Sequence, residues 1–311
     1  MHTKTPSKTP GYLPVLLILF ALSGCSALIY EVVWYQSLQL AIGSTSVSLG
    51  VLLATYMGGL CIGSLWLPRR RFTQHPLKIY AALEAGIALC ALLVHLGLPY
   101  LSRVYVVGAE SGLPGMLLRG LLSAVCMLPR TILMGASLPA IVRWIEGTRE
   151  GVAWWGFLYG ANTLGAVCGC LLAGFWLLRV YNMATAIYVS MAINLGVAAI
   201  SYLMAGMIAA PAPSAAAEEE SAPAETSSGS NWPVYLTIAL SGATALGAEV
   251  VWTRLLGMLL LATVYIFSII LAVFLGGLAI GSAAGSALLR RVKPQAALGW
   301  CQILLALGMA W

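Results

Sequence analysis

The stretch ALSGCSALIYEVVW, residues 21–34, decides how the chain is interpreted, because a related stretch, ALSGATALGAEVVW, occupies residues 239–252. Each copy places a glutamate inside an apolar segment and a tryptophan three residues later: Glu31 and Trp34 in the first copy, Glu249 and Trp252 in the second. A carboxylate within an apolar membrane-spanning helix is costly and usually has a partner or a function. Two copies in one chain indicate an internal duplication.

The two copies stay in register beyond this stretch, because the same offset in residue number that relates Glu31 to Glu249 continues without a gap. The matched pairs include residues that chance similarity between apolar segments would not align: Gly59 with Gly277, Gly63 with Gly281, Pro76 with Pro294 and Glu84 with Gln302. Unrelated apolar segments share leucine and alanine, but not Glu, Trp, Gly and Pro in one frame. The sequence therefore predicts two related halves, and we call residues related by this offset equivalent positions.

The composition places the chain among membrane proteins. Of its 311 residues, 60% are hydrophobic and 8% are charged, and the mean hydropathy is +0.92, far from the values of soluble domains. A bilayer core is crossed by roughly 20 apolar residues in a helix. Nine apolar runs are predicted, the ninth too short to cross: 13–41, 46–67, 78–99, 115–142, 153–178, 183–206, 234–260, 264–288 and 296–311.

These runs predict an all-α polytopic protein of major-facilitator-like organisation. We divide the chain into four parts: an N-terminal tail (1–12), a first six-helix half (13–206), a linker (207–232) and an incomplete second half of three helices (233–311). The linker is rich in Pro, Ala, Ser and Glu, which predicts disorder. Six spans before the linker give both halves one orientation, as in a parallel repeat. A second half matching the first needs three further spans, so we expect the chain to be a fragment.

The charges predict orientation and exclude some classes of function. Basic residues concentrate in the loops on the side of the N-terminus, which the positive-inside rule assigns to the cytoplasm, so we expect a multi-pass protein of the bacterial cytoplasmic membrane. The net charge of +6 is not gathered in a basic, aromatic-rich polar surface, so no nucleic-acid partner is expected. The seven cysteines all lie in predicted spans, where Cys acts as a small hydrophobe, and no metal site is expected.

Arg130 is the most unusual residue of the fourth run, where it follows Pro129 in an apolar context. An arginine at such depth requires a partner or hydration, and three acids are available: Glu31, Glu84 and Glu249. Two interpretations stay open, namely a pairing that locks the helix bundle and a role in anion binding or substrate gating. Arg254 is predicted to point toward the other half of the protein.

Other polar and small residues have two interpretations each. Glu84 belongs either to a helix end at the cytoplasmic surface, paired with Lys78 or Arg71, or to a polar site between helices. Asn162 either bonds a neighbouring helix or contacts a substrate. The glycine pairs suit close helix packing or a glycine-lined path: Gly59 with Gly63, and Gly277 with Gly281.

Four motifs carry a resemblance to a known family. They are ALIYEVVW (27–34), GGLCIGS (58–64), LMGASLP (133–139) and YGANTLGAVCG (159–169). Together they resemble the membrane region of spermidine-synthase-like bacterial proteins, in which a major-facilitator-like domain is fused to an aminopropyltransferase domain. The resemblance implies a C-terminal or separate synthase domain as a partner. The chain itself has no aspartate and no glycine-rich loop between a strand and a helix, so no catalytic residue and no cofactor are expected in it.

These observations lead to a functional hypothesis with two alternatives. The leading hypothesis is transport or binding of a small cationic amine, such as a polyamine, within the bilayer. The candidate site combines intramembrane polar and aromatic residues: Glu31, Glu249, Arg130, Arg254, Asn162, Glu84, Trp34 and Trp252. The alternatives are a non-transporting anchor or assembly subunit, and the membrane part of an aminopropyltransferase.

Overall fold

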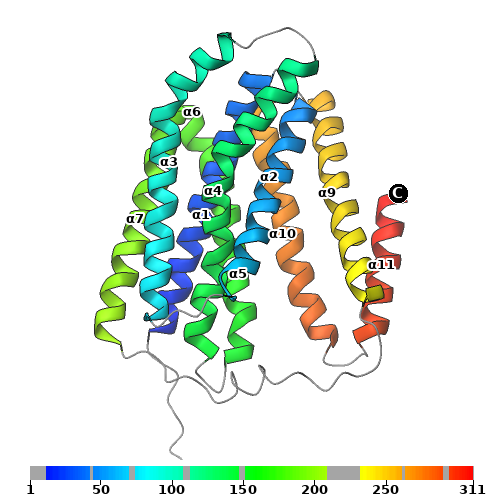
Figure 1. The fold of residues 1–311 in the computed structure, drawn as a ribbon. Coiled ribbons are helices and arrows are strands. Elements are labelled where there is room, and N and C mark those ends of the chain that lie inside the picture. The colour runs from blue at the N-terminus through cyan, green and yellow to red at the C-terminus, as the bar shows by residue number, and fades with distance from the viewer. Residues whose placement is uncertain are drawn as a thin grey trace, which may run out of the picture. The chain divides into compact units, whose positions relative to one another are not determined.

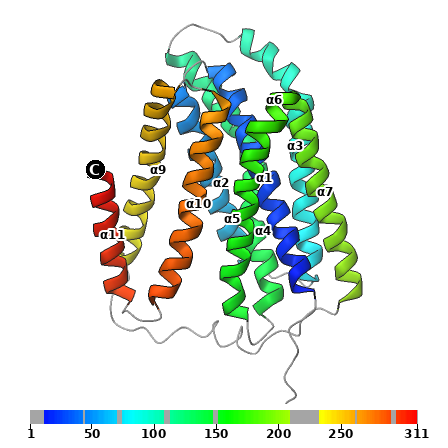
Figure 2. The same ribbon diagram turned by 180° about the vertical axis from the view of Figure 1, so that it is seen from behind.

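The computed structural model describes residues 12–42, 45–69, 74–107, 113–146, 151–208, 232–260, 263–289 and 294–310. Within these ranges every regular element is a helix (Figures 1 and 2). Eight helical segments of the described chain are long and apolar enough to cross a membrane. The protein is therefore an integral multi-pass membrane protein, and the prediction of an all-helical polytopic architecture is confirmed.

The helices follow the predicted apolar runs, with longer third and fourth members. The helices of the first half are α1 Leu13–Ile42, α2 Thr45–Trp66, α3 Pro76–Val107, α4 Leu113–Glu146, α5 Gly151–Leu172, η1 Ala173–Leu177, α6 Leu178–Val180 and α7 Met183–Met207. The later ones are α9 Trp232–Leu260, α10 Val264–Leu289 and α11 Pro294–Ala310. A π-helical turn, η1, joins α5 to α6, so the three elements form one candidate span.

The chain separates into two compact units, Met1–Ala212 and Pro213–Trp311. We call them unit 1, which contains α1 to α7, and unit 2, which contains α9 to α11. The boundary falls within the segment 207–232 that the composition marks as a linker. The disorder predicted for that segment concerns residues 209–231, which lie outside the described residues.

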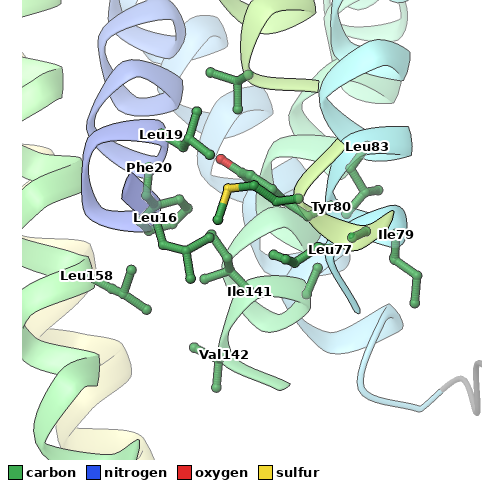
Figure 3. Close-up of a cluster of buried hydrophobic side chains, with 14 of the residues drawn as sticks. Leu16, Leu19, Phe20, Leu77, Ile79, Tyr80, Leu83, Ile141, Val142 and Leu158 are labelled. Carbon is green, nitrogen blue, oxygen red and sulfur yellow. The ribbon is translucent and has the colours of Figure 1, made fainter. Parts of the chain in front are cut away.

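Helix α1 lies at the centre of unit 1, where it packs against α2, α4, α5 and α7. Figure 3 shows the apolar core that it forms with its neighbours. Buried side chains converge there from four helices: Leu16, Leu19 and Phe20 of α1, Leu77, Tyr80 and Leu83 of α3, Ile141 and Val142 of α4, and Leu158 of α5. Because lipid is as apolar as leucine, tight van der Waals packing rather than the hydrophobic effect stabilises such a core.

Glycines set the closest approach between helices of unit 1. A Cβ atom at Gly59 would overlap Thr131 of α4, and one at Gly63 would overlap the carbonyl oxygen of Ile132. Gly135 of α4 lies in the same way against the backbone of Leu60. Small residues that allow helix backbones to approach are typical of membrane helix pairs. Gly59 and Gly63 thus lie at a packing contact between α2 and α4.

Their equivalents in unit 2 behave differently. A Cβ atom added at Gly277 or Gly281 would meet no atom within 4 Å in the described part of the chain. Close helix packing at these two glycines is not observed among the described residues and stays a prediction. The reason is that no described helix of unit 2 takes the position that α4 takes against α2 in unit 1.

The helix bounds follow the sequence duplication. Helix α1 ends at Ile42 and α9 at Leu260, which are equivalent positions, and α3 and α11 begin at the matched prolines Pro76 and Pro294. Proline suits the first position of a helix, because its missing N–H has no partner there in any case. The first helix of each unit thus ends, and the third begins, at equivalent residues.

A tertiary contact is duplicated as well. In unit 1 the Ser23 hydroxyl of α1 donates a hydrogen bond to Glu84 Oε1 of α3 over 2.6 Å. In unit 2 the Gln302 side-chain amide of α11 donates to the Ser241 hydroxyl of α9 over 3.0 Å. Ser241 is equivalent to Ser23, and Gln302 is equivalent to Glu84. The first and third helices of each unit are therefore held together by the same pair of positions.

Candidate functional site

Arg130 lies in the middle of α4 and is only 2% exposed. Its guanidinium carbon lies 4.4 Å from the ring centroid of Tyr30 and 5.2 Å from that of Trp34, both on α1. Cations are attracted to the faces of aromatic rings at such distances. None of the three guanidinium nitrogens forms a hydrogen bond with a residue that the structure describes. Among the described residues, the faces of two aromatic rings thus lie against this cation.

Glu31 supplies a carboxylate to the same cluster. It is 4% exposed on α1 and interacts electrostatically with Arg130, as does Tyr56 of α2. Of the three acids predicted as partners of Arg130, Glu31 is the one with which it interacts electrostatically, and no hydrogen bond joins the two side chains. An acid and a base that are both removed from water need each other, because either one alone would be strongly disfavoured.

The contact between α2 and α4 determines where Arg130 lies. Pro129 precedes Arg130 inside α4, and the Thr131 hydroxyl donates to the Leu128 carbonyl oxygen over 3.0 Å. The same Thr131 side chain rests on Gly59 of α2. Because Gly59 has no side chain, α4 approaches closely enough to hold the Arg130 guanidinium against α1.

Glu84 lies buried between helices. It is 0% exposed and accepts the hydrogen bond from Ser23 described above. The alternative of a surface pair with Lys78 is wrong, since the Lys78 ammonium lies over the Tyr202 ring, 5.9 Å from its centroid. The other surface partner considered, Arg71, lies outside the described residues. The arrangement ties α3 to α1.

Asn162 joins α5 to α1. Its side-chain amide donates to the Phe20 carbonyl oxygen over 3.1 Å, and its own backbone lies against Gly24. Two further glycines of α5, Gly165 and Gly169, lie against the α1 backbone. Of the two interpretations of Asn162, the observed contact matches the hydrogen bond to a neighbouring helix.

In unit 2 the equivalent acid lines an open pocket. Glu249 is 6% exposed, and it borders a cavity of about 420 Å³ between α9, α10 and α11. Other lining residues are mainly apolar or aromatic: Ala248, Trp252, Ile270, Val273 and Phe274. No hydrogen bond or ion pair joins Glu249 to a residue within the described ranges of unit 2. A carboxylate in such surroundings is suited to a cationic ligand.

The tryptophans that follow the two acids differ in exposure, and the one in unit 2 is the more exposed. Trp34 is 6% exposed, whereas Trp252 is 48% exposed. Arg254, two residues after Trp252, is exposed on α9. Its predicted orientation toward the other half stays a prediction.

Comparisons of the chain with protein-family models, curated proteins and solved structures found no match. Interpretation of the site therefore depends on the geometry of the two acids. No group of three or more His, Cys, Asp or Glu side chains that could hold a metal ion occurs among the described residues.

Sequence reasoning named the two tryptophans but missed three other aromatic residues: Tyr30, Tyr56 and Phe274. Tyr30 and Tyr56 lie near Arg130, and Phe274 lines the pocket of unit 2. The signal was present in the register, because Phe274 is the equivalent of Tyr56. Aromatic residues are common in apolar helices, so only their position beside an acid distinguishes these three.

Proposed function

We propose that this multi-pass membrane protein binds a small organic cation within the bilayer and moves it across. The observation that carries the proposal is the buried Glu249 carboxylate, which borders the pocket of unit 2 and has no partner among the described residues there. Within a membrane, such an acid is a functional-site candidate by default.

The pocket has the size and lining of a small-molecule site. Its volume of about 420 Å³ falls in the range of pockets that enclose drug-sized ligands, roughly 300 to 1,000 Å³. The walls are apolar and aromatic, and Glu249 is the charged group that lines them. An amine would fit this arrangement with its alkyl chain against the walls, its ammonium on the carboxylate and a cation–π contact to Trp252.

The resemblance of the four sequence motifs to spermidine-synthase-like proteins supports the same ligand class. On that basis we propose a major-facilitator-like parallel repeat in the bacterial cytoplasmic membrane, with the N-terminus in the cytoplasm and a polyamine or related amine as ligand. A synthase domain, fused or separate, is the proposed partner. The choice of a polyamine as ligand and of a synthase domain as partner rests on this sequence resemblance, since a fold alone does not define an activity.

Unit 1 has a structural role in this proposal. Its acid, Glu31, already shares the bundle interior with the cation of Arg130, and its tryptophan is buried. We therefore assign ligand binding to Glu249 and helix locking to the cluster around Arg130.

The test is binding and uptake of radiolabelled spermidine by the full chain in proteoliposomes. Glu249→Gln removes the charge while it keeps the size of the side chain, and we expect at least a tenfold loss of affinity, which corresponds to about 1.4 kcal/mol. Thr237→Val is the matched control, because Thr237 is a partly exposed residue of the same helix, lies outside the pocket and bonds only the Pro233 carbonyl oxygen. Unchanged binding in Glu249→Gln would remove the proposed role of this acid.

A second candidate function, assembly with another membrane protein, is favoured by the bare glycine face of α10. Gly277 and Gly281 are four residues apart and have open space beside them, which suits the close approach of a helix. Gly281→Ile would then weaken self-association or capture of a partner helix, measured by energy transfer between labelled chains in vesicles. Gly276→Ile is the control, since Gly276 has equally open surroundings but lies about 100° around the helix from Gly277.

A further inference from the structure

We propose that the pocket beside Glu249 recognises a guanidinium group in preference to a simple ammonium. This inference rests on the proposed function and names the cation class that the site takes. It follows from a comparison of the pocket with the surroundings of Arg130, which show how the duplicated sequence accommodates a guanidinium in unit 1.

Four residues near the Arg130 guanidinium have equivalents in the repeat that line the pocket of unit 2. Arg130 lies near four residues of α1 and α2: Tyr30, Glu31, Trp34 and Tyr56. The equivalent positions are Ala248, Glu249, Trp252 and Phe274, and all four line the same pocket of about 420 Å³. The sequence alone did not require these four residues to meet.

The first helix of each unit, which carries three of these four positions, is joined to the third helix in the same way. The hydrogen bond between Ser23 and Glu84 and the one between Ser241 and Gln302 link equivalent positions, so the first and third helices of each unit are in contact at the same level. The pocket of unit 2 is thus lined by the positions that surround the guanidinium of unit 1, on a first helix that is tied to its third helix in the same way.

Unit 2 differs from unit 1 in two ways that leave this place free. First, the surface of α10 that corresponds to the α4-binding surface of α2 is open at Gly277 and Gly281. Second, Tyr30 is replaced by Ala248, which removes a ring from the wall of the site. The additional space suits a free ligand that consists of a guanidinium group and an alkyl chain.

The retained groups suit a guanidinium better than an ammonium. A carboxylate such as Glu249 accepts two parallel hydrogen bonds from the planar guanidinium fork. The face of Trp252 offers a surface on which that plane can stack. A guanidinium is also more weakly hydrated than an ammonium, so it loses less on entering an apolar pocket.

The experiment compares n-butylguanidinium with n-butylammonium, which have the same alkyl chain and the same charge. Binding to the full chain in lipid nanodiscs is measured by calorimetric titration. We expect n-butylguanidinium to bind at least tenfold more tightly, and Trp252→Leu to reduce this preference below threefold. Trp232→Leu is the matched control and should leave both affinities unchanged, because Trp232 is on the same helix, 66% exposed and outside the pocket.

The outcomes separate this inference from the proposed function. Equal affinities for the two cations, both lost in Glu249→Gln, would overturn the guanidinium preference and leave the proposed function standing. Failure of both cations and of spermidine to bind would overturn the two together. Trp252 is half-exposed, so its replacement should leave the fold intact, which helix content by circular dichroism verifies.

A final arm distinguishes a free guanidinium from one carried by a helix. The probe is a membrane-inserted peptide with the sequence of residues 113–146, in its natural form and with Arg130→Leu. Binding of the natural peptide alone, blocked by Glu249→Gln, would support guanidinium recognition but with a helix as its source. Equal binding of both peptides would contradict the inference.

Discussion

Unit 1 and unit 2 contain the same three-helix sequence frame, yet they treat its acid differently. In unit 1, α4 packs on α2 and brings Arg130 beside Glu31, and Trp34 is buried. In unit 2, Glu249 lines an open pocket and Trp252 is half-exposed. The difference shows that the repeated acid-and-tryptophan motif does not by itself decide whether the acid is enclosed or lines an open pocket. In unit 1 the acid is enclosed because a further helix, α4, packs on α2 and carries the Arg130 cation.

The energetic reason is the cost of an isolated buried charge. In unit 1 an internal cation offsets the charge of the acid and aromatic faces surround that cation. In unit 2 the described residues offer no such cation to Glu249, so this acid is either neutralised by a proton or paired with a cation from a ligand or a partner. Breaking a buried pair costs several kcal/mol, because it leaves one charge uncompensated. Three sets of substitutions test this comparison, in order of decreasing effect.

The largest effect is expected from Arg130→Leu. It removes the cation of unit 1 and leaves Glu31 in the position that Glu249 has in unit 2, at a cost of about 3 to 5 kcal/mol. The measurement is the unfolding free energy of the purified protein in detergent. Arg179→Leu is the control, because Arg179 is exposed and an exposed charge contributes roughly 1 kcal/mol or less. Equal stability of the Arg130→Leu variant and the parent would show that the cluster does not lock unit 1.

The next effect comes from placing one methyl group at equivalent glycines. Gly63→Ala inserts a Cβ against the Ile132 carbonyl and should destabilise the protein by about 1 to 3 kcal/mol. Gly281→Ala enters open space and should be neutral or stabilising by up to about 1 kcal/mol, since alanine is the better helix former. Thermal unfolding of both variants checks the opposite signs. A similar loss in both would mean that α10 is packed as closely as α2.

The smallest effect is expected where the two units agree. Glu84→Gln places in unit 1 the residue that unit 2 has at Gln302, where an amide bonds the matched serine. We therefore expect a change of less than about 1 kcal/mol, because the hydrogen bond is kept. Ser23→Ala removes the donor to Glu84 and should cost about 1 to 3 kcal/mol, as a buried group is then left unsatisfied. A double-mutant cycle with these two changes measures the coupling, and zero coupling would contradict the assigned bond.

Several features were predictable because they depend on local properties of the chain. The length and apolarity of the runs predicted membrane-spanning helices, and the register of the repeat predicted which helices correspond, down to the prolines that begin α3 and α11. The glycine spacing predicted close packing, which the structure shows at Gly59 and Gly63. At Gly277 and Gly281 close packing stays a prediction, because it needs a second helix that the glycine sequence does not specify.

The surroundings of Glu84 could not be predicted from the sequence. Its distance along the chain from the basic residues Lys78 and Arg71 suggested a surface pair, but its depth depends on where α3 meets α1. The helix starts at Pro76 and Glu84 comes two turns later, which places the carboxylate beside Ser23. Because every face of a bundle helix in lipid is apolar, hydropathy gives no indication of which face meets a neighbour.

The sequence by itself determined that this is a multi-pass helical protein with an internal duplication and one acid in each copy. The tertiary structure alone decided that Glu31 meets an arginine held on aromatic rings, whereas the equivalent surroundings of Glu249 form a pocket. The physical reason is that helix formation and membrane insertion depend on the composition of about 20 consecutive residues. The partner of a buried charge is set by contacts between helices far apart in the chain, such as Glu31 and Arg130.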